Sequence, residues 1–77
     1  MNKTTGILAV NDDENMLTTF SIAIRREGYT VDTAKTGKET IEKSDTSFYN
    51  VALIDIRLPD MEGTELLAKM KEITPRM

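Results

Sequence analysis

The fold is decided by residues 50–67, which read NVALIDIRLPDMEGTELL. The stretch opens with an uninterrupted apolar run, Val51–Ile54, that stops at the carboxylate of Asp55. A short run of this kind is typical of a strand buried in a parallel sheet. Pro59 and Gly63 then mark a loop. Apolar residues at helical spacing follow and predict a helix: Leu66, Leu67, Met70 and Ile73.

The start of the chain repeats this pattern. The apolar run Ile7–Val10 predicts a second buried strand, which the polar segment Asn11–Asp13 stops. A helix is expected over about 14–27, with Gly28 as its left-handed stop. The stripe of this helix that faces the core is predicted to contain Met16, Leu17, Phe20, Ala23 and Ile24.

The middle of the chain is more polar. The alternating, β-branched stretch Tyr29–Ala34 predicts a strand near the edge of the sheet. Thr36 and Glu39 stand at the spacing of a capping box and open a helix expected over about 37–46. The apolar face of that helix consists mainly of Ile41.

Strands that alternate with helices predict an α/β fold with a parallel sheet and right-handed crossovers. The strand orders 1-2-3 and 2-1-3 both satisfy this rule. We expect the two most apolar strands to be covered on both faces and the polar strand to lie at an edge, which favours the order 2-1-3. No repeat, linker or low-complexity tract divides the sequence, so residues 1–77 are expected to form a single unit.

The composition of the chain argues against several classes of function. The 77 residues carry a net charge of −3 and include neither cysteine nor histidine. These facts argue against a basic nucleic-acid footprint, disulfides, structural zinc sites and imidazole catalysis. No apolar run approaches the ~20 residues that span a bilayer, and no signal peptide opens the chain. We expect a cytoplasmic protein with no membrane or nucleic-acid partner.

Acidic residues gather at one end of the predicted sheet. Ligands of an open parallel sheet bind outside the carboxyl ends of its strands, where the strand order reverses. In the order 2-1-3 that point lies between the strand that Asn11–Asp13 ends and the strand that Asp55 ends. Crowded carboxylates need a cation among them, and hard oxygen ligands suit Mg²⁺ or Mn²⁺. In an alternative interpretation Asp13 is only the N-cap of the first helix. Asp60 and Glu62 are expected to be solvated turn residues.

Three segments resemble the receiver domain of two-component response regulators: ILAVNDDENM (7–16), GYTVDTAKTGKETIEK (28–43) and NVALIDIRLPDMEGTELL (50–67). The similarity covers nearly all of residues 6–77, and the last segment is the most specific because of its Asp, Pro and Gly spacing. The resemblance implies a flavodoxin-like fold, in which a parallel sheet lies between two layers of helices. It also implies a signalling domain rather than an enzyme, with at most weak self-dephosphorylation.

The resemblance implies roles for individual residues as well. Asp55 corresponds to the residue that accepts a phosphoryl group from a sensor histidine kinase or phosphotransfer protein. Asp12, Asp55 and the backbone carbonyl of Arg57 correspond to the ligands of Mg²⁺ or Mn²⁺. Asn11 stands where the family usually has a second acidic residue, so it is expected to be at most an outer-shell partner of a weakly held metal. A one-residue slip would instead pair Asp12 with Asp13. We prefer the unslipped alignment because the residue before Asn11 is expected to end the strand.

The family fold has five strands, and this sequence stops where the fourth would begin. We therefore expect a partial receiver that lacks strands four and five, together with the hydroxyl and lysine residues that they carry in the family. Three functions are compatible with this: a truncated receiver that still accepts phosphate, an interaction module without phosphorylation, and an aspartyl-nucleophile phosphatase. The phosphatase is least favoured, because the haloacid dehalogenase type has Asp-x-Asp where this sequence has Asp55-Ile56-Arg57.

A homodimer is also expected. In the order 2-1-3 the apolar strand Val51–Ile54 becomes an edge, and apolar edges with unpaired backbone groups pair with other chains. The alternative is a poorly folded fragment that aggregates. Ile22 lies off the stripe of the first helix and is a candidate for contact with a partner.

Overall fold

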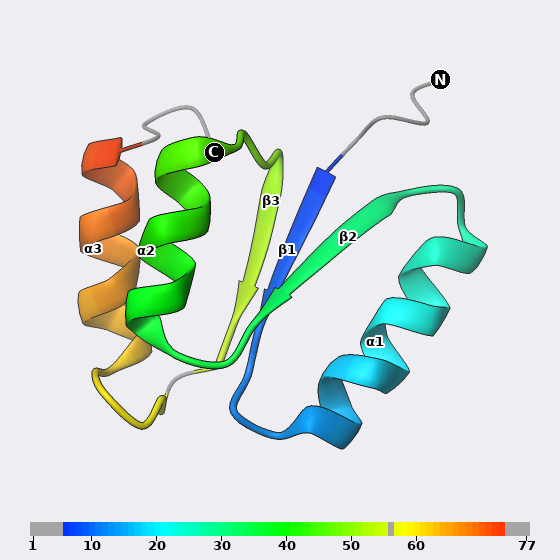
Figure 1. Ribbon diagram of the computed structural model, residues 1–77, viewed down its shortest axis with the longest axis horizontal. Coiled ribbons are helices and arrows are strands. Elements are labelled where there is room, and N and C mark those ends of the chain that lie inside the picture. The colour runs from blue at the N-terminus through cyan, green and yellow to red at the C-terminus, as the bar shows by residue number, and fades with distance from the viewer. Residues whose placement is uncertain (1–5, 56, 74–77) are drawn as a thin grey trace.

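The computed structural model describes residues 6–55 and 57–73. Strands and helices alternate, as the sequence predicts (Figure 1): β1 Gly6–Val10, α1 Glu14–Arg26, β2 Thr30–Ala34, α2 Gly37–Thr46, β3 Val51–Ile54 and α3 Gly63–Ile73. The strands are parallel and lie in the order β2-β1-β3. The predicted α/β class and the order 2-1-3 are confirmed. None of the described helices is long and apolar enough to cross a membrane.

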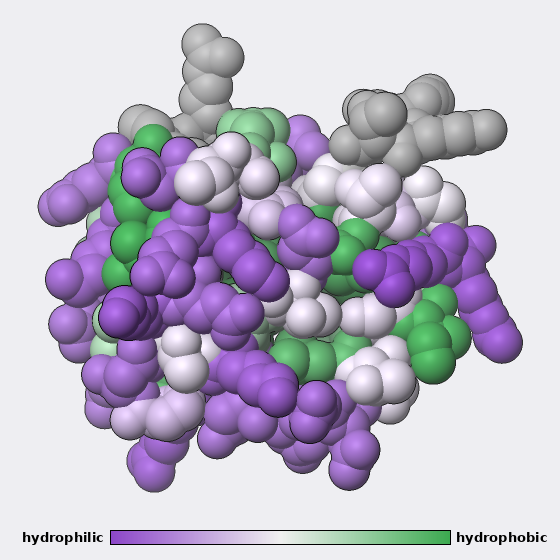
Figure 2. All heavy atoms as spheres, viewed as in Figure 1, coloured by the Kyte–Doolittle hydropathy of each residue, from purple (hydrophilic) through white to green (hydrophobic). Residues whose placement is uncertain are grey.

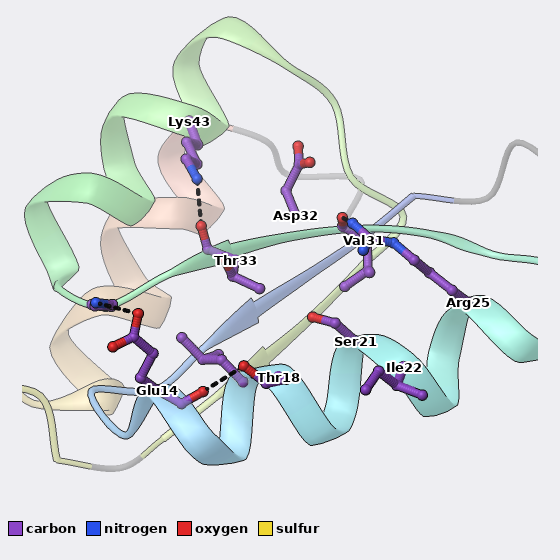
Figure 3. A pocket seen from close by; sticks show the side chains of 11 residues that line it. Glu14, Thr18, Ser21, Ile22, Arg25, Val31, Asp32, Thr33 and Lys43 are labelled. Carbon is purple, nitrogen blue, oxygen red and sulfur yellow. Dashed lines mark hydrogen bonds and ion pairs between the residues drawn. The ribbon is translucent and has the colours of Figure 1, made fainter.

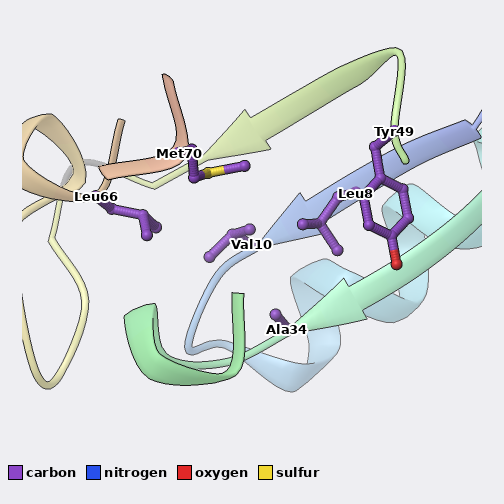
Figure 4. Close-up of a cluster of buried hydrophobic side chains, with 6 residues drawn as sticks. All are labelled: Leu8, Val10, Ala34, Tyr49, Leu66 and Met70. Atoms are coloured by element: carbon purple, nitrogen blue, oxygen red, sulfur yellow. The ribbon is translucent and has the colours of Figure 1, made fainter. Parts of the chain in front are cut away.

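Helices cover the sheet on both faces. α1 lies on one face, while α2 and α3 pack side by side on the other (Figure 1). The smaller core, on the α1 face, is formed by Ala9, Leu17 and Val31. The larger core lies between the sheet and the α2–α3 pair, and six buried side chains form it (Figure 4): Leu8, Val10, Ala34, Tyr49, Leu66 and Met70. β1 contributes to both cores and is therefore the central, doubly covered strand.

β3 is not covered on both faces, and the sequence expectation was wrong here. The register pairs Val51 with Ile7 and Leu53 with Ala9, which places both β3 side chains on the α1 face. Right-handed crossovers leave α1 alone on that face, and α1 packs against β1 and β2. Val51 and Leu53 consequently remain 43% and 44% exposed.

The ends of the helices follow the local sequence. Thr36 Oγ1 accepts the backbone N–H of Glu39 at 3.0 Å, which confirms the predicted cap of α2. The carboxylate of Glu39 reaches the N–H of Lys35, at 2.9 Å, instead of the N–H of the cap residue. Gly28 has a φ of 94°, a conformation that side chains disfavour, and it follows α1 as expected.

The helix faces differ in part from the predicted stripes. Met16 and Leu67 are 42% and 47% exposed, and Ala23 is exposed as well. The buried face of α2 includes the polar residues Thr40 and Ser44. Thr40 is buried at little cost because its hydroxyl donates to a carbonyl of its own helix start at 2.8 Å. The hydropathy of the residues alone therefore does not identify the buried face of α2.

Candidate functional site

The candidate site lies where β1 and β3 end side by side. Val10 is paired with Ile54, and the N–H of Asp55 donates to the carbonyl of Val10 at 2.9 Å. The segments that begin with Asn11 and with Asp55 are therefore neighbours, as the sequence predicts. β1 is flanked by β2 and β3, so this is the point at which the strand order reverses.

The turn between β1 and α1 uses two of its polar side chains internally. Asn11 Oδ1 accepts the N–H of Asp13 at 2.9 Å. Asp13 Oδ1 caps α1 by accepting the N–H groups of Asn15 at 2.9 Å and Met16 at 3.3 Å. The N-cap interpretation of Asp13 is confirmed. β1 ends at Val10, as the unslipped alignment expects, and Asp12 as a cation ligand stays a prediction from the family resemblance.

Asp12 and Asp55 keep their carboxylates available. Neither side chain forms a hydrogen bond or ion pair with residues 6–55 or 57–73. Asp12 is exposed and Asp55 is half-buried. Within the same ranges, no three acidic, histidine or cysteine side chains are grouped to hold a cation. The candidate donors are thus two carboxylates and the carbonyl of Arg57, a set that fits Mg²⁺, which typically takes one or two carboxylates and keeps several waters.

The loop between β3 and α3 closes on itself. The N–H of Leu58 donates to the carbonyl of Met61 at 3.1 Å, and Arg57 forms an isolated antiparallel bridge with Glu62. Glu62 is exposed, as expected, and its carbonyl accepts the N–H of Leu66 at 3.0 Å. Arg57 is therefore carried on a compact turn that leads directly into α3.

Asp60 is exposed in the loop, as the sequence predicts, but its carboxylate also binds the start of α2. Its Oδ1 accepts the N–H of Gly37 at 2.8 Å, and its Oδ2 accepts the N–H of Lys38 at 2.9 Å. These hydrogen bonds hold the pKa of the Asp60 carboxyl below its usual range. The contact joins residues 23 and 22 positions apart, and no local pattern signals it.

A polar groove of about 420 Å³ lies between α1 and β2, and its lining includes neither Asp12 nor Asp55 (Figure 3). Arg25 there donates to the carbonyl of Val31 at 2.9 Å, and Lys43 donates to the carbonyl of Thr33. These carbonyls point away from β1, because strand carbonyls alternate and that of Ala34 bonds toward the β1 side. Two cationic side chains thus cover the outer edge of β2. The side of the molecule seen in Figure 2 is mostly hydrophilic, with smaller hydrophobic patches.

The sequence and the fold both resemble those of response regulators. The family model for the response regulator receiver domain matches residues 7–77. The alkaline phosphatase synthesis transcriptional regulatory protein PhoP of Bacillus subtilis is 33% identical over 72 residues, which make up 94% of this chain and 29% of that protein.

Solved structures of response regulator receiver domains resemble this chain as well. A CheY-like response regulator receiver domain protein from Methanospirillum hungatei has a TM-score of 0.91 and 44% identity, over 94% of this chain and 58% of that one. The response regulator TrrA from Thermotoga maritima, solved in complex with Mg²⁺-BeF, has a TM-score of 0.88 and 28% identity, over 94% and 63% of the two chains.

These comparisons confirm the predicted flavodoxin-like fold and the family resemblance. The chain spans only 29% to 31% of the length of the curated relatives that it matches. The match to the family model, in contrast, extends over residues 7–77 of the 77 present. The chain belongs to the response regulator receiver domain family.

Proposed function

We propose that this chain accepts a phosphoryl group on Asp55 in a two-component phosphorelay. The donor is a phosphohistidine on a sensor histidine kinase or a phosphotransfer protein. One carboxylate oxygen of Asp55 attacks the phosphorus, and the phosphorus–nitrogen bond breaks. The imidazole nitrogen keeps the electron pair and takes a proton from water, and the product is an aspartyl phosphate.

The position of Asp55 is the observation that carries this proposal. Its backbone is fixed to the end of β1 at 2.9 Å, its side chain is half-buried, and its carboxylate is not used by the described residues. A divalent cation held by Asp12, Asp55 and the carbonyl of Arg57 would offset the charge of the incoming phosphoryl oxygens. Mg²⁺ and Mn²⁺ suit these hard oxygen donors.

Intact mass after incubation with acetyl phosphate and Mg²⁺ tests the assignment. The wild type is expected to gain one phosphoryl group and Asp55→Asn none. Asp45→Asn is the matched control, because it removes another aspartate, exposed on α2, and should be labelled like the wild type. A phosphoryl adduct that persists in Asp55→Asn overturns the proposal.

Self-association is a second candidate function, and the difference between the two sheet edges favours it. Arg25 and Lys43 cover the outer carbonyls of β2. Among the described strands β3 pairs with β1 alone, and its exposed side chains Val51 and Leu53 are uncharged. We infer that two copies of the chain pair through β3 about a two-fold axis, since an uncharged strand meets its own copy without like-charge repulsion.

The proposed kinase or phosphotransfer partner implies that the chain acts in the cytoplasm. The net charge of −3 gives no support to a nucleic-acid partner, so the partners proposed are the kinase or phosphotransfer protein and a second copy of the chain.

A further inference from the structure

Asp60 connects the loop that follows Asp55 to the start of α2. Its carboxylate accepts the N–H groups of Gly37 at 2.8 Å and Lys38 at 2.9 Å. Each bond uses a different oxygen of the same carboxylate, so the side chain is fixed in orientation as well as in position. Asp60 is exposed, and both donors are backbone groups at the start of a helix.

These N–H groups are ones that α2 does not satisfy from its own residues. Thr36 accepts the N–H of Glu39 with its hydroxyl at 3.0 Å and that of Thr40 with its carbonyl at 3.1 Å. The two N–H groups before them bond to Asp60. A carboxylate at this place also faces the positive end of the helix dipole. The lowered pKa of Asp60 agrees with this.

The residue after Asp60 packs on the same helix start. Gly37 is buried, and a Cβ added to it would lie 2.5 Å from the Cγ and Sδ atoms of Met61. A side chain at residue 37 would therefore push Met61 away. Asp60 and Met61, which both contact the start of α2, form what we call the α2 clamp.

One more hydrogen bond connects the α2 clamp to the proposed cation site. The N–H of Leu58 donates to the carbonyl of Met61 at 3.1 Å, and Leu58 directly follows Arg57. At its other end the loop is tied to β1, because the N–H of Asp55 donates to Val10 at 2.9 Å. The loop is thus fastened at one end by the sheet and at the other by α2.

We propose that Asp60 is a positioning residue of the cation site: by binding the first N–H groups of α2 it holds the loop so that the carbonyl of Arg57 serves as a ligand. This inference rests on the proposed function, because it assumes a cation held by Asp12, Asp55 and that carbonyl. Energetic coupling between two sites is reciprocal, so cation binding also strengthens the bonds at the start of α2.

Titration of ¹⁵N-labelled protein with Mg²⁺, followed by calorimetry and by amide resonances, tests the role of Asp60. In the wild type the resonances of Gly37 and Lys38 are expected to shift as Mg²⁺ binds. Asp60→Ala should weaken Mg²⁺ binding about tenfold, as the loss of a partner behind a ligand typically does. Asp60→Asn keeps one acceptor oxygen and should give an intermediate affinity.

Thr36→Ala is the matched control. It removes a cap from the same helix, but the bond it deletes stays within the α2 segment and does not involve the loop. The Mg²⁺ affinity of Thr36→Ala should remain within about twofold of the wild type, since the lost hydrogen bond stabilises only the start of α2. Hydrogen exchange at the N–H of Leu58 gives a measurement that needs no cation, and exchange should be faster in Asp60→Ala than in Thr36→Ala.

The outcomes separate this inference from the proposed function. Equal Mg²⁺ affinity in Asp60→Ala and Thr36→Ala, with a wild type that binds, overturns the positioning role and leaves the proposed function standing. A wild-type chain that does not bind Mg²⁺ overturns both. Unchanged exchange at Leu58 in Asp60→Ala shows that the α2 clamp does not hold the loop, and this result also overturns the inference.

Discussion

The hydroxyl of Tyr49 donates a 2.6 Å hydrogen bond to Oδ2 of Asp32 and thereby joins the segment before β3 to β2, across the central strand β1. Tyr49 is only 4% exposed, and its ring belongs to the larger core together with Leu8 (Figure 4). Burial, together with the hydrogen bond to Asp32 and its charge, raises the pKa of Tyr49 to about 12. The stability of the fold therefore depends on the protonation of the Tyr49 hydroxyl.

We predict that the stability of the fold decreases between pH 10 and pH 12. In the unfolded chain the tyrosine loses its proton near its ordinary pKa of 10.0, whereas in the folded chain it keeps the proton up to a pKa of about 12. The contribution of Tyr49 is therefore complete below pH 10 and is lost as the pH rises through 12. Tyr49→Phe should flatten this part of the profile and cost about 1 kcal/mol at neutral pH through the lost hydrogen bond.

Thermal unfolding followed by circular dichroism at a series of pH values measures this effect. Tyr29→Phe is the control, because Tyr29 is the other of the two tyrosines and is 42% exposed. If both substitutions change the alkaline profile equally, the pair formed by Tyr49 and Asp32 is not its cause.

Asn11→Asp should tighten Mg²⁺ binding by about tenfold, because added ligand charge strengthens sites for hard cations. The substitution is expected to preserve the local turn, since one carboxylate oxygen can still accept the N–H of Asp13, as Asn11 Oδ1 does at 2.9 Å. The other oxygen becomes available to the cation or to its waters. Calorimetric titration measures the affinity, and an unchanged value would mean that residue 11 faces away from the metal.

Leu53→Lys should convert the proposed dimer into a monomer. Leu53 is 44% exposed on β3, and a lysine there places two like charges close together when the strand meets its own copy. Light scattering coupled to size exclusion gives the mass, and Met16→Lys, a change of an exposed residue on α1, is the control that should leave it unchanged. A folded wild-type monomer, unaltered in size and stability by Leu53→Lys, would contradict the dimer.

Two adjacent leucines in α3 should respond differently to truncation. Leu66 is 0% exposed and belongs to the larger core, whereas Leu67 is 47% exposed. Leu66→Ala should lower the free energy of unfolding by about 2–5 kcal/mol, because it leaves a cavity. Leu67→Ala should cost less, about 1 kcal/mol, since about half of its surface already lies in water. Urea denaturation of both variants at low protein concentration makes the comparison, and equal losses would show that the helix is rotated from its observed orientation.

The order of the elements and the place of the site follow from patterns within a few residues. The apolar run Val51–Ile54 and the cap Thr36 specify a strand and a helix start by local physics. The right-handed crossover rule then leaves only the orders 1-2-3 and 2-1-3, and the polarity of one strand selects between them. Because parallel strands end at a common edge, the segments that carry Asp12 and Asp55 can be predicted to be neighbours without knowledge of any tertiary contact.

Only the tertiary structure decided which polar groups far apart in the chain meet. Asp60 bonds to Gly37 across 23 positions, and Tyr49 bonds to Asp32 across 17. The exposure of Leu67 beside the buried Leu66 was equally undecided by helical spacing, since both lie on the predicted stripe. A carboxylate or hydroxyl bonds to whichever donor or acceptor the packing of helices on the sheet brings within reach. Such a choice leaves no periodicity in the sequence, whereas the burial of a strand or the start of a helix does.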